Sequence, residues 1–260
     1  RQMCIRDRLK GTEKRDKYKV YGELINTYGY NLEPGSKELT ALNYYTNEEI
    51  TIPLDPTQTP GENAQRYFAK YNKQKRTFEA LTELIQETAD DIQYLESISN
   101  ALDIALSEAD LAQIKEELMQ SGYIRRKHTK KKVKLTSKPM HYIASDGYDM
   151  YVGKNNLQNE ELTFSFANGN DWWFHAKGAP GSHVIVKSGG DELPDRTFEE
   201  AGRLAAYYSK NRGADKVEID YIQKKHVKKP NGAKPGFVVY YTNYSLVIDS
   251  DISNIKNVQD

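Results

Sequence analysis

The spacing of apolar residues changes twice along this chain and divides it into three zones. In the first zone, residues 9–28 carry four apolar residues at helical spacing among many basic ones, which predicts a basic helix. Residues 39–45 and 49–54 are strand-like on either side of a Thr-Asn-Glu turn, which predicts a β-hairpin. The Asp-Pro and Thr-Pro steps at 55–60 predict a rigid connector, because each proline fixes its own φ and restricts the preceding residue.

The second zone is a heptad pattern from about residue 61 to residue 105. A helix of about 45 residues would extend roughly 67 Å, and such length without an internal proline favours a coiled-coil arm over one helix of a compact bundle. Because residues 9–28 are too short to partner this arm, we expect the chain to be a piece of a longer protein. The seam, imperfect at three polar positions, consists of Ala64, Phe68, Tyr71, Lys75, Phe78, Thr82, Ile85, Ala89, Ile92, Leu95, Ser99, Leu102 and Leu106.

A shorter helix should follow the long one. Ser107 is expected to cap its start, with Asp110 three residues further on. Ser121 and Gly122 are expected to end it, since glycine commonly terminates helices.

The third zone, from about residue 138 onward, predicts a separate α+β domain. Two helices are expected near residues 156–166 and 197–211, among strands that mostly follow short connections. This order implies a mixed or antiparallel sheet with helices on one face. The strand candidates are His141–Ala144, Asp149–Val152, Trp172–Ala176, His183–Lys187, Val217–Ile222, Phe237–Thr242 and Ser245–Ile248.

The fold class is therefore α+β, and the zones define four parts. Residues 1–8 match nothing downstream in pattern and are treated as an artefact. Residues 9–122 form the helical arm with its hairpin, 123–137 a basic linker, and 138–260 the sheet domain.

The charges balance in sum but are separated into blocks. Lys plus Arg and Asp plus Glu each number 37. Residues 125–138 carry eight basic side chains and no acid, and residues 203–234 carry nine basic side chains against three acids. Residues 62–119 offset this positive charge, with twelve acids and six basic side chains. Such separation predicts a surface that meets polyanions at one end only.

Several classes of protein are disfavoured by what the sequence lacks. No run approaches the ~18 apolar residues of a membrane span, and no secretory signal opens the chain. The only cysteine is Cys4, which favours a reducing, cytoplasmic location. The signatures of zinc proteases, P-loop proteins and serine hydrolases are absent. We predict no cofactor and no metal site.

The stretch 171–187 is the richest in side chains that could bind a ligand or catalyse a reaction. It holds two His, two Lys and both tryptophans of the protein. Val184–Val186 resembles a buried strand after a Pro-Gly-Ser turn. This arrangement would present imidazoles, an ammonium group and an aromatic plane at one rim, which suits a stacked base and a phosphate or else a catalytic pocket. Because strand residues alternate, only one of Trp172 and Trp173 should face the core, and the sequence leaves open which.

Two polar segments are expected to bind phosphate. Lys154–Asn159 places a lysine and four amides at a helix start, where free backbone amides attract anions, although an asparagine there would equally cap the helix. Residues 224–236 form a basic loop with two turn signals. An exposed tryptophan beside them would add a stacking face of about 1–3 kcal/mol per base.

Together these motifs resemble the NFACT family of bacterial ribosome quality-control factors, often labelled fibronectin-binding proteins. The similarity runs from about Lys17 to Ile252, and the family's NFACT-N and helix-hairpin-helix regions are expected to be missing. Residues 54–68 resemble its coiled-coil region. The motifs similar to its NFACT-R domain are Gly153–Asn159, Asp171–His175, Pro180–Val184 and Lys234–Gly236.

The resemblance implies a function in translation. The family binds large ribosomal subunits obstructed by peptidyl-tRNA, recruits alanyl-tRNA and extends the stalled chain with a C-terminal alanine tail. The implied partners are therefore the large ribosomal subunit and tRNA. Peptide-bond formation would belong to the ribosome, so this chain is not expected to be an enzyme, nor to support tailing without the missing regions.

The predicted function is thus an RNA-binding, ribosome-docking module. One alternative is an RNA-processing pocket around His175 and His183, which with Asp171 would also suit a metal. Another is a protein-binding adhesin, suggested only by the family label. The residues predicted to contact RNA are Lys154, Asn155, Asn156, Asn159, Trp173, His175, Lys177, Ser182, His183, Lys187, Lys224, Lys225, Lys228, Lys229 and Lys234.

Overall fold

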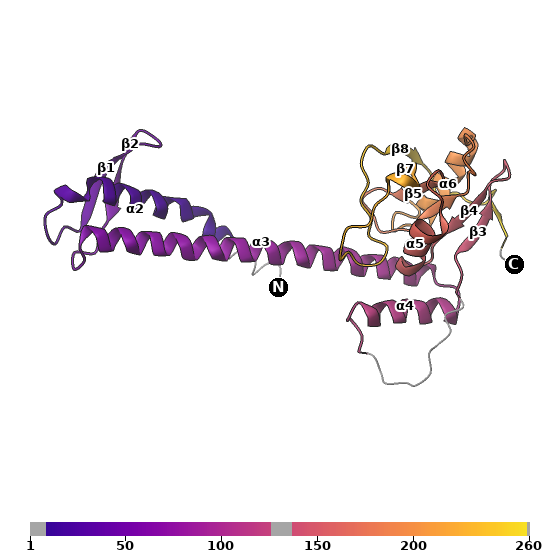
Figure 1. Cartoon of the computed structure of the whole chain (residues 1–260), viewed down its shortest axis with the longest axis horizontal. Helices are drawn as coiled ribbons and strands as arrows, with labels where there is room; N and C mark the ends of the chain where they lie inside the picture. Colours follow the sequence, from indigo (N-terminus) through magenta and orange to yellow (C-terminus); the bar gives the residue numbers. More distant parts are fainter. Residues whose placement is uncertain (1–8, 126–136, 259–260) are drawn as a thin grey trace. The chain divides into compact units, whose positions relative to one another are not determined.

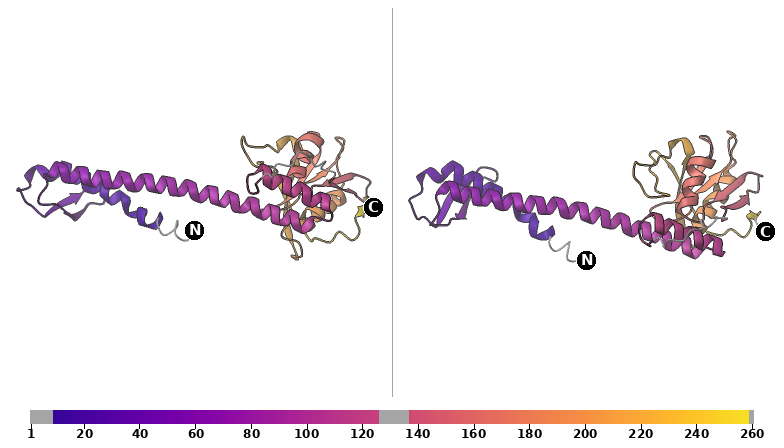
Figure 2. Two further views of the ribbon diagram at one scale, coloured as in Figure 1. Left: turned by 90° about the horizontal axis from the view of Figure 1, so that it is seen from below. Right: turned by 60° about the horizontal axis from the view of Figure 1, so that its bottom comes forward.

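The computed structural model describes residues 9–125 and 137–258 of the chain. The described residues form two compact units that are divided between Asp91 and Ile92, and each unit has a core of its own. Figures 1 and 2 show the ribbon of both units. Residues 1–8 and most of the predicted basic linker lie outside the described residues. None of the described helices combines the length and hydrophobicity needed to cross a membrane.

The first unit consists of two helices and a hairpin. α2 (Asp16–Tyr28) runs beside the first half of α3 (Pro60–Ile104), and β1 (Glu38–Asn43) pairs antiparallel with β2 (Glu48–Pro53) (Figure 1). Two 3-10 turns, Glu13–Arg15 and Gly29–Asn31, flank α2. The hairpin and the long helix predicted from the sequence are confirmed. The core of this unit consists of Leu24, Ile25, Leu39, Ala41, Ile52, Leu54, Ala64 and Tyr67.

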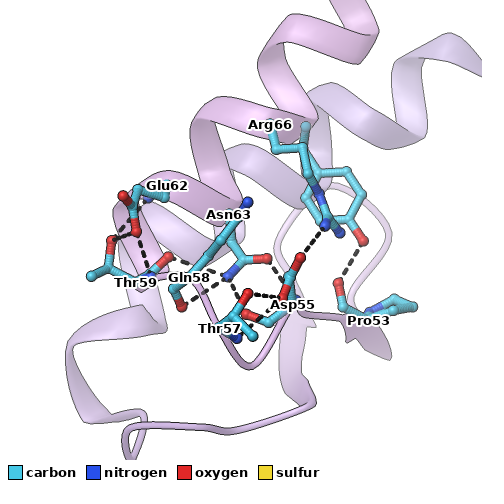
Figure 3. A network of polar contacts seen from close by, with 9 residues as sticks. Pro53, Asp55, Thr57, Gln58, Thr59, Glu62, Asn63 and Arg66 are labelled. Atoms are coloured by element: carbon cyan, nitrogen blue, oxygen red, sulfur yellow. Dashed lines mark hydrogen bonds and ion pairs between the residues drawn. The ribbon is translucent and has the colours of Figure 1, made fainter.

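The predicted connector between β2 and α3 is held by side-chain hydrogen bonds as well as by its prolines (Figure 3). Asn63 is buried; its Oδ1 accepts from the Asp55 amide at 2.8 Å, and its Nδ2 donates to the carbonyls of Asp55, Gln58 and Thr59 at 3.0–3.3 Å. Thr59 and Glu62 cap the start of α3 reciprocally, since each side chain accepts from the other residue's amide. This network fixes where α3 begins.

The predicted heptad seam agrees with the burial of α3 only in its first half. Within the first unit, Phe68, Tyr71 and Phe78 are partly buried, and the Arg15 guanidinium lies 4.0 Å from the Phe78 ring. Beyond residue 91 the seam residues Ile92, Leu95, Leu102 and Leu106 are exposed.

In the second unit a different face of α3 is buried, which corrects that part of the predicted seam. The inward residues are Tyr94, Ile98 and Ala101, which form a cluster with Ile114 of α4 (Glu108–Gln120). These positions lie one residue away from the predicted seam, a rotation of about 100° on a helix. The approach of α4 therefore decides which face is covered. Ser107 caps α4 with Asp110 as predicted, in a complete capping box.

The second unit is built around a seven-stranded sheet with the strand order β8-β7-β5-β6-β4-β3-β9. Every pairing between these strands is antiparallel, which confirms the predicted sheet. The strands are β3 (Met140–Ile143), β4 (Asp149–Val152), β5 (Trp172–Ala176), β6 (Val184–Val186), β7 (Val217–Gln223), β8 (Tyr244–Ile248) and β9 (Lys256–Asn257).

One predicted strand does not form, and one strand was not predicted. Residues 237–242 make only an isolated bridge, between Val239 and Lys228, because β8 already pairs with that edge of β7. Val238 and Tyr240 instead pack onto a face of the sheet. The strand β9 has only two residues, which is too short for an alternating sequence pattern to predict it.

Both faces of the sheet are covered. The sequence predicts helices on one face only, but helical segments lie on both faces. α6 (Asp195–Tyr207) packs on the face that carries Phe174 and Val184. The opposite face, which carries Trp173 and Ile185, is covered by Leu162 and by the segment around Val227 and Tyr240. Leu162 opens the π-helical turn η3 (Leu162–Phe166), which continues α5 (Asn156–Glu161).

Candidate nucleic-acid interface

The polar segment at the start of α5 contacts the helices that precede the sheet. Asn155 caps α5 by accepting from the Gln158 amide at 3.0 Å, and its Nδ2 donates to Gln113 Oε1 at 2.7 Å. Asn156 Nδ2 donates to Ser97 Oγ at 2.7 Å and to Glu117 Oε1 at 2.8 Å. Both asparagines are buried, so their amides hold α4 and the end of α3 against α5.

A carboxylate occupies the position at this helix start where a phosphate was predicted. Glu117 is fully buried and also accepts from the Tyr94 hydroxyl at 3.0 Å. Burial raises the pKa of Glu117, while the Asn156 side chain and the backbone amides of Asn156 and Leu157 favour its charged form. Lys154 is likewise engaged, with its Nζ 3.3 Å from the buried Asp110 carboxylate.

Asn159, His183 and Gly153 meet at the other end of the same segment. Asn159 Oδ1 accepts from the His183 amide at 3.0 Å, and its Nδ2 donates to the Gly181 carbonyl at 3.3 Å. A Cβ on Gly153 would lie 2.2 Å from Asn159 Oδ1, so this close approach requires glycine. Ser182 is buried beside them and donates its amide to the Tyr208 carbonyl at 3.0 Å. These predicted RNA contacts serve the fold in this arrangement.

The two histidines of the strand-turn-strand converge. Their ring centroids lie 5.4 Å apart with perpendicular planes, and His183 Nδ1 is 2.8 Å from the Thr163 hydroxyl. Burial lowers the pKa of His175 to about 4, and burial together with His175 lowers the pKa of His183 well below its usual value. Both rings are therefore neutral near pH 7 and offer no positive charge to a phosphate. Across the described part of the chain, no three His, Cys, Asp or Glu side chains gather to hold a metal ion.

The expectation that only one tryptophan faces a core is wrong, because both faces of the sheet are covered: Trp172 packs against one core cluster, and Trp173 lies within the other. Trp173 is fully buried between His175, His183 and Tyr240, so a base cannot stack on it in this arrangement. Trp172 points to the opposite face, where it is partly exposed and packs against Phe198.

The predicted lysines fall into two groups. Some are paired: Lys177 with Glu218, Lys187 with Asp171 at 2.5 Å, and Lys229 with Glu160 at 2.7 Å. Lys234 lies 4.6 Å from the Tyr94 ring and donates to the Tyr123 hydroxyl at 3.0 Å. By contrast, Lys225 and Lys228 are exposed and form no ion pair within the described residues, and Lys224 lies 5.9 Å from the Phe164 ring. Lys224, Lys225 and Lys228 are thus the most available cations of the predicted set.

An aromatic row beside these lysines was not predicted from the sequence. The His141 ring on β3 lies parallel to the Tyr151 ring on β4 with centroids 4.6 Å apart, and Tyr151 meets Phe166 edge-on at 4.7 Å. The Lys187 ammonium lies 4.8 Å from the Phe166 ring. The alternation of β4 was a usable signal for Tyr151, but the approach of Phe166 depends on the π-helical turn, which has no evident sequence pattern.

Comparison with known proteins identifies both parts of the chain. Residues 3–137 match the family of NFACT N-terminal and middle domains, and residues 138–241 match the NFACT protein RNA binding domain. The chain belongs to the NFACT family. This confirms the resemblance seen in the sequence motifs.

Similar members of the NFACT family include proteins named Rqc2 homolog RqcH. The one from Streptococcus pneumoniae (strain D39) is 42% identical over 252 residues, which cover 96% of this chain and 45% of the relative. The one from Bacillus subtilis is 40% identical over 254 residues, covering 95% and 44%. This chain therefore spans about half the length of the curated relatives it matches.

A solved structure shares the fold. It is the C-terminal part of the fibronectin/fibrinogen-binding protein from Streptococcus suis, with a TM-score of 0.69 and 37% sequence identity. The similarity covers 96% of this chain and 90% of that one.

Proposed function

We propose that this chain is the RNA-binding, ribosome-docking part of a cytoplasmic ribosome quality-control factor. The match of residues 138–241 to the NFACT RNA binding domain carries the proposal, and its relatives named Rqc2 homolog RqcH support the assignment to ribosome quality control. The large ribosomal subunit and tRNA are the proposed partners. Alanine tailing is proposed for the longer protein, with peptide-bond formation left to the ribosome rather than to this chain.

The exposed lysines give this proposal a physical basis. Lys225 and Lys228 are exposed and without a carboxylate partner among the described residues, so a bound phosphate need not displace an acid. Each lysine that meets a phosphate releases condensed counterions, which makes RNA binding weaken as salt rises. We keep the complete predicted set as the hypothesis and place Lys224, Lys225, Lys228 and Lys229 first for testing.

The test is binding of labelled tRNA and of purified large ribosomal subunits across a salt series. Changing Lys224, Lys225, Lys228 and Lys229 together to Ala should weaken binding and reduce the slope of log affinity against log salt by about 0.7–0.9 for each phosphate that a removed lysine had neutralised. A charge-matched control changes four exposed lysines of the first unit, Lys10, Lys37, Lys73 and Lys75. Equal effects of the two quadruple variants on tRNA would contradict the assignment of this loop.

A second candidate, an RNA-processing enzyme, is favoured by one observation, the convergence of His175 and His183 at 5.4 Å. Against it, His183 is only 2% exposed and both rings are uncharged near neutral pH. RNA cleavage by the pure chain that disappears in a His175→Ala variant would establish this activity. Binding without cleavage would leave the docking function standing.

The adhesin hypothesis has a separate test. The Streptococcus suis relative is described as a fibronectin/fibrinogen-binding protein. Detectable binding of fibronectin to this chain at micromolar concentration would revive that function for it.

A further inference from the structure

The aromatic row His141, Tyr151 and Phe166 lies at the surface, where Tyr151 borders the core on its face of the sheet. Phe166 is 41% exposed, and the His141 side chain is partly exposed. The rings come from β3, β4 and η3, so the fold brings together three segments that are separate in sequence. Aromatic rings that the fold already holds in place present a stacking face at low entropic cost.

We propose that Phe166, supported by Tyr151 and His141, stacks an unpaired base of bound RNA, and that Lys187, Lys224 and Lys225 hold the phosphates of the same strand. This inference rests on the proposed RNA-binding function and names the site and the kind of RNA. It differs from the stacking face predicted from the sequence, because Trp173 is fully buried.

Cations lie at the Phe166 end of the row and favour a nucleic-acid strand there over an apolar partner, whereas at the other end His141 Nε2 lies 2.7 Å from the half-exposed Asp149 carboxylate. The Lys187 ammonium lies 4.8 Å from the Phe166 ring, and Lys224 lies 5.9 Å from the Phe164 ring in the same π-helical turn. Asp171, which pairs with Lys187, is only 1% exposed, so a ligand at the surface meets the ammonium more readily than the carboxylate.

The backbone places the basic loop next to this turn. The amides of Lys224 and Lys225 donate to the carbonyls of Asp171 and Gly169, at 2.8 Å and 3.0 Å. Asp171 in turn accepts from the Asn168 amide at 2.7 Å, just after the end of η3. The basic loop thus starts beside the aromatic row. Proteins that bind single-stranded nucleic acids combine cations and aromatic rings in this way.

The ligand should be an unpaired segment rather than a duplex. Bases inside a helix already stack on their neighbours, and an A-form duplex presents mainly phosphates and 2′-hydroxyls to a protein. Bases in loops and single strands have free faces, and each face that stacks on an aromatic ring adds affinity regardless of sequence.

The test compares a short adenine oligonucleotide with a blunt-ended RNA duplex that carries the same number of phosphates, each across a salt series. Phe166→Ala should weaken binding of the oligonucleotide by about fivefold or more while leaving the salt slope unchanged, because every lysine that meets a phosphate is still present. Binding of the duplex should stay the same. Phe166→Tyr, which keeps a ring, should restore binding of the oligonucleotide.

Tyr244→Ala is the matched control, since Tyr244 is 60% exposed and contacts Trp172 on the opposite face of the sheet. The inference is overturned if Phe166→Ala binds the oligonucleotide like the unchanged chain, if it weakens both RNAs equally, or if Tyr244→Ala weakens binding as much. If the quadruple lysine variant loses RNA while Phe166→Ala does not, the docking function stands and only this stacking site fails. If the unchanged chain binds neither RNA in a salt-dependent way, the proposed function fails as well.

Discussion

At the residue scale, Gly153 shows how closely single atoms constrain the region around the start of α5. A Cβ there would lie 2.2 Å from Asn159 Oδ1 and 3.0 Å from the Asn159 amide nitrogen. Asn159 cannot move away freely, because it holds the His183 amide and the Gly181 carbonyl. The glycine of this motif is therefore explained by packing, with no need for a ligand.

We expect Gly153→Ala to destabilise the second unit by about 1–3 kcal/mol, since the backbone must shift to relieve the clash. Urea unfolding followed by tryptophan fluorescence measures this, because both tryptophans lie on β5. Gly169→Ala is the control: its Cβ would meet only Lys225 Cβ at 3.6 Å, an ordinary contact. Similar losses of stability in both variants would rule out the close approach as the cause.

Glu117 gives the region a defined dependence on pH. Because burial raises its pKa above the ordinary value of 4.5, the folded state binds the proton more tightly than the unfolded state does. Its contribution to stability is therefore present below pH 4.5 and is lost as pH rises through the raised pKa. The free energy of unfolding of the unchanged chain minus that of Glu117→Gln should fall over this range in urea titrations. A difference that rises with pH, or stays constant, would contradict the raised pKa.

At the element scale, the start of α3 depends on one buried amide. Asn63→Ala removes the partner of the Asp55 amide and of three carbonyls, and leaving such groups unsatisfied costs about 1–3 kcal/mol. We expect faster hydrogen exchange in the hairpin and in the first turns of α3, measured by mass spectrometry. Gln65→Ala, at an exposed position of the same helix, should leave exchange unchanged. If the two variants behave alike, the network in Figure 3 is not what holds this helix start.

Elements with local signals were predictable from the sequence. Ser107 and Asp110 form a capping box within four residues, and β4 and β5 form at the positions their alternation predicts. Residues 237–242 were not predictable, because whether an apolar run joins a sheet depends on which edge is still free. Which face of α3 is buried beyond residue 91 depends in the same way on α4, whose Ile114 packs against Tyr94, Ile98 and Ala101.

The residue types of the candidate site could be predicted from the sequence, but the contacts that each side chain makes could not. The sequence identified a polar helix start and a basic loop, and both lie within the residues that match the NFACT protein RNA binding domain. It could not show that Asn156 bonds to Glu117, 39 residues away, or that Lys154 meets Asp110, 44 residues away. A side chain that contacts such a distant partner is of the same residue type as one that is free to bind RNA. Only the folded structure distinguishes the two.

At the scale of the whole molecule, the two units have separate cores with no shared residues. Effects of substitutions in independent sites add, usually within about 0.5 kcal/mol. We therefore expect Asn63→Ala to leave the urea midpoint reported by tryptophan fluorescence unchanged while it accelerates exchange in the first unit. A shift of that midpoint would mean that the two cores unfold cooperatively.

The junction between α4 and α5 is made chiefly of amides, a carboxylate and an ammonium group. Opening that junction would expose little apolar surface, because the apolar residues Ile114 and Leu118 of α4 cluster with residues of α3 instead. Heat capacity and denaturant sensitivity both scale with the surface that becomes hydrated. Release of α4 from α5 would thus change the heat capacity and the denaturant sensitivity only a little, whereas unfolding of the sheet would change both by a large amount.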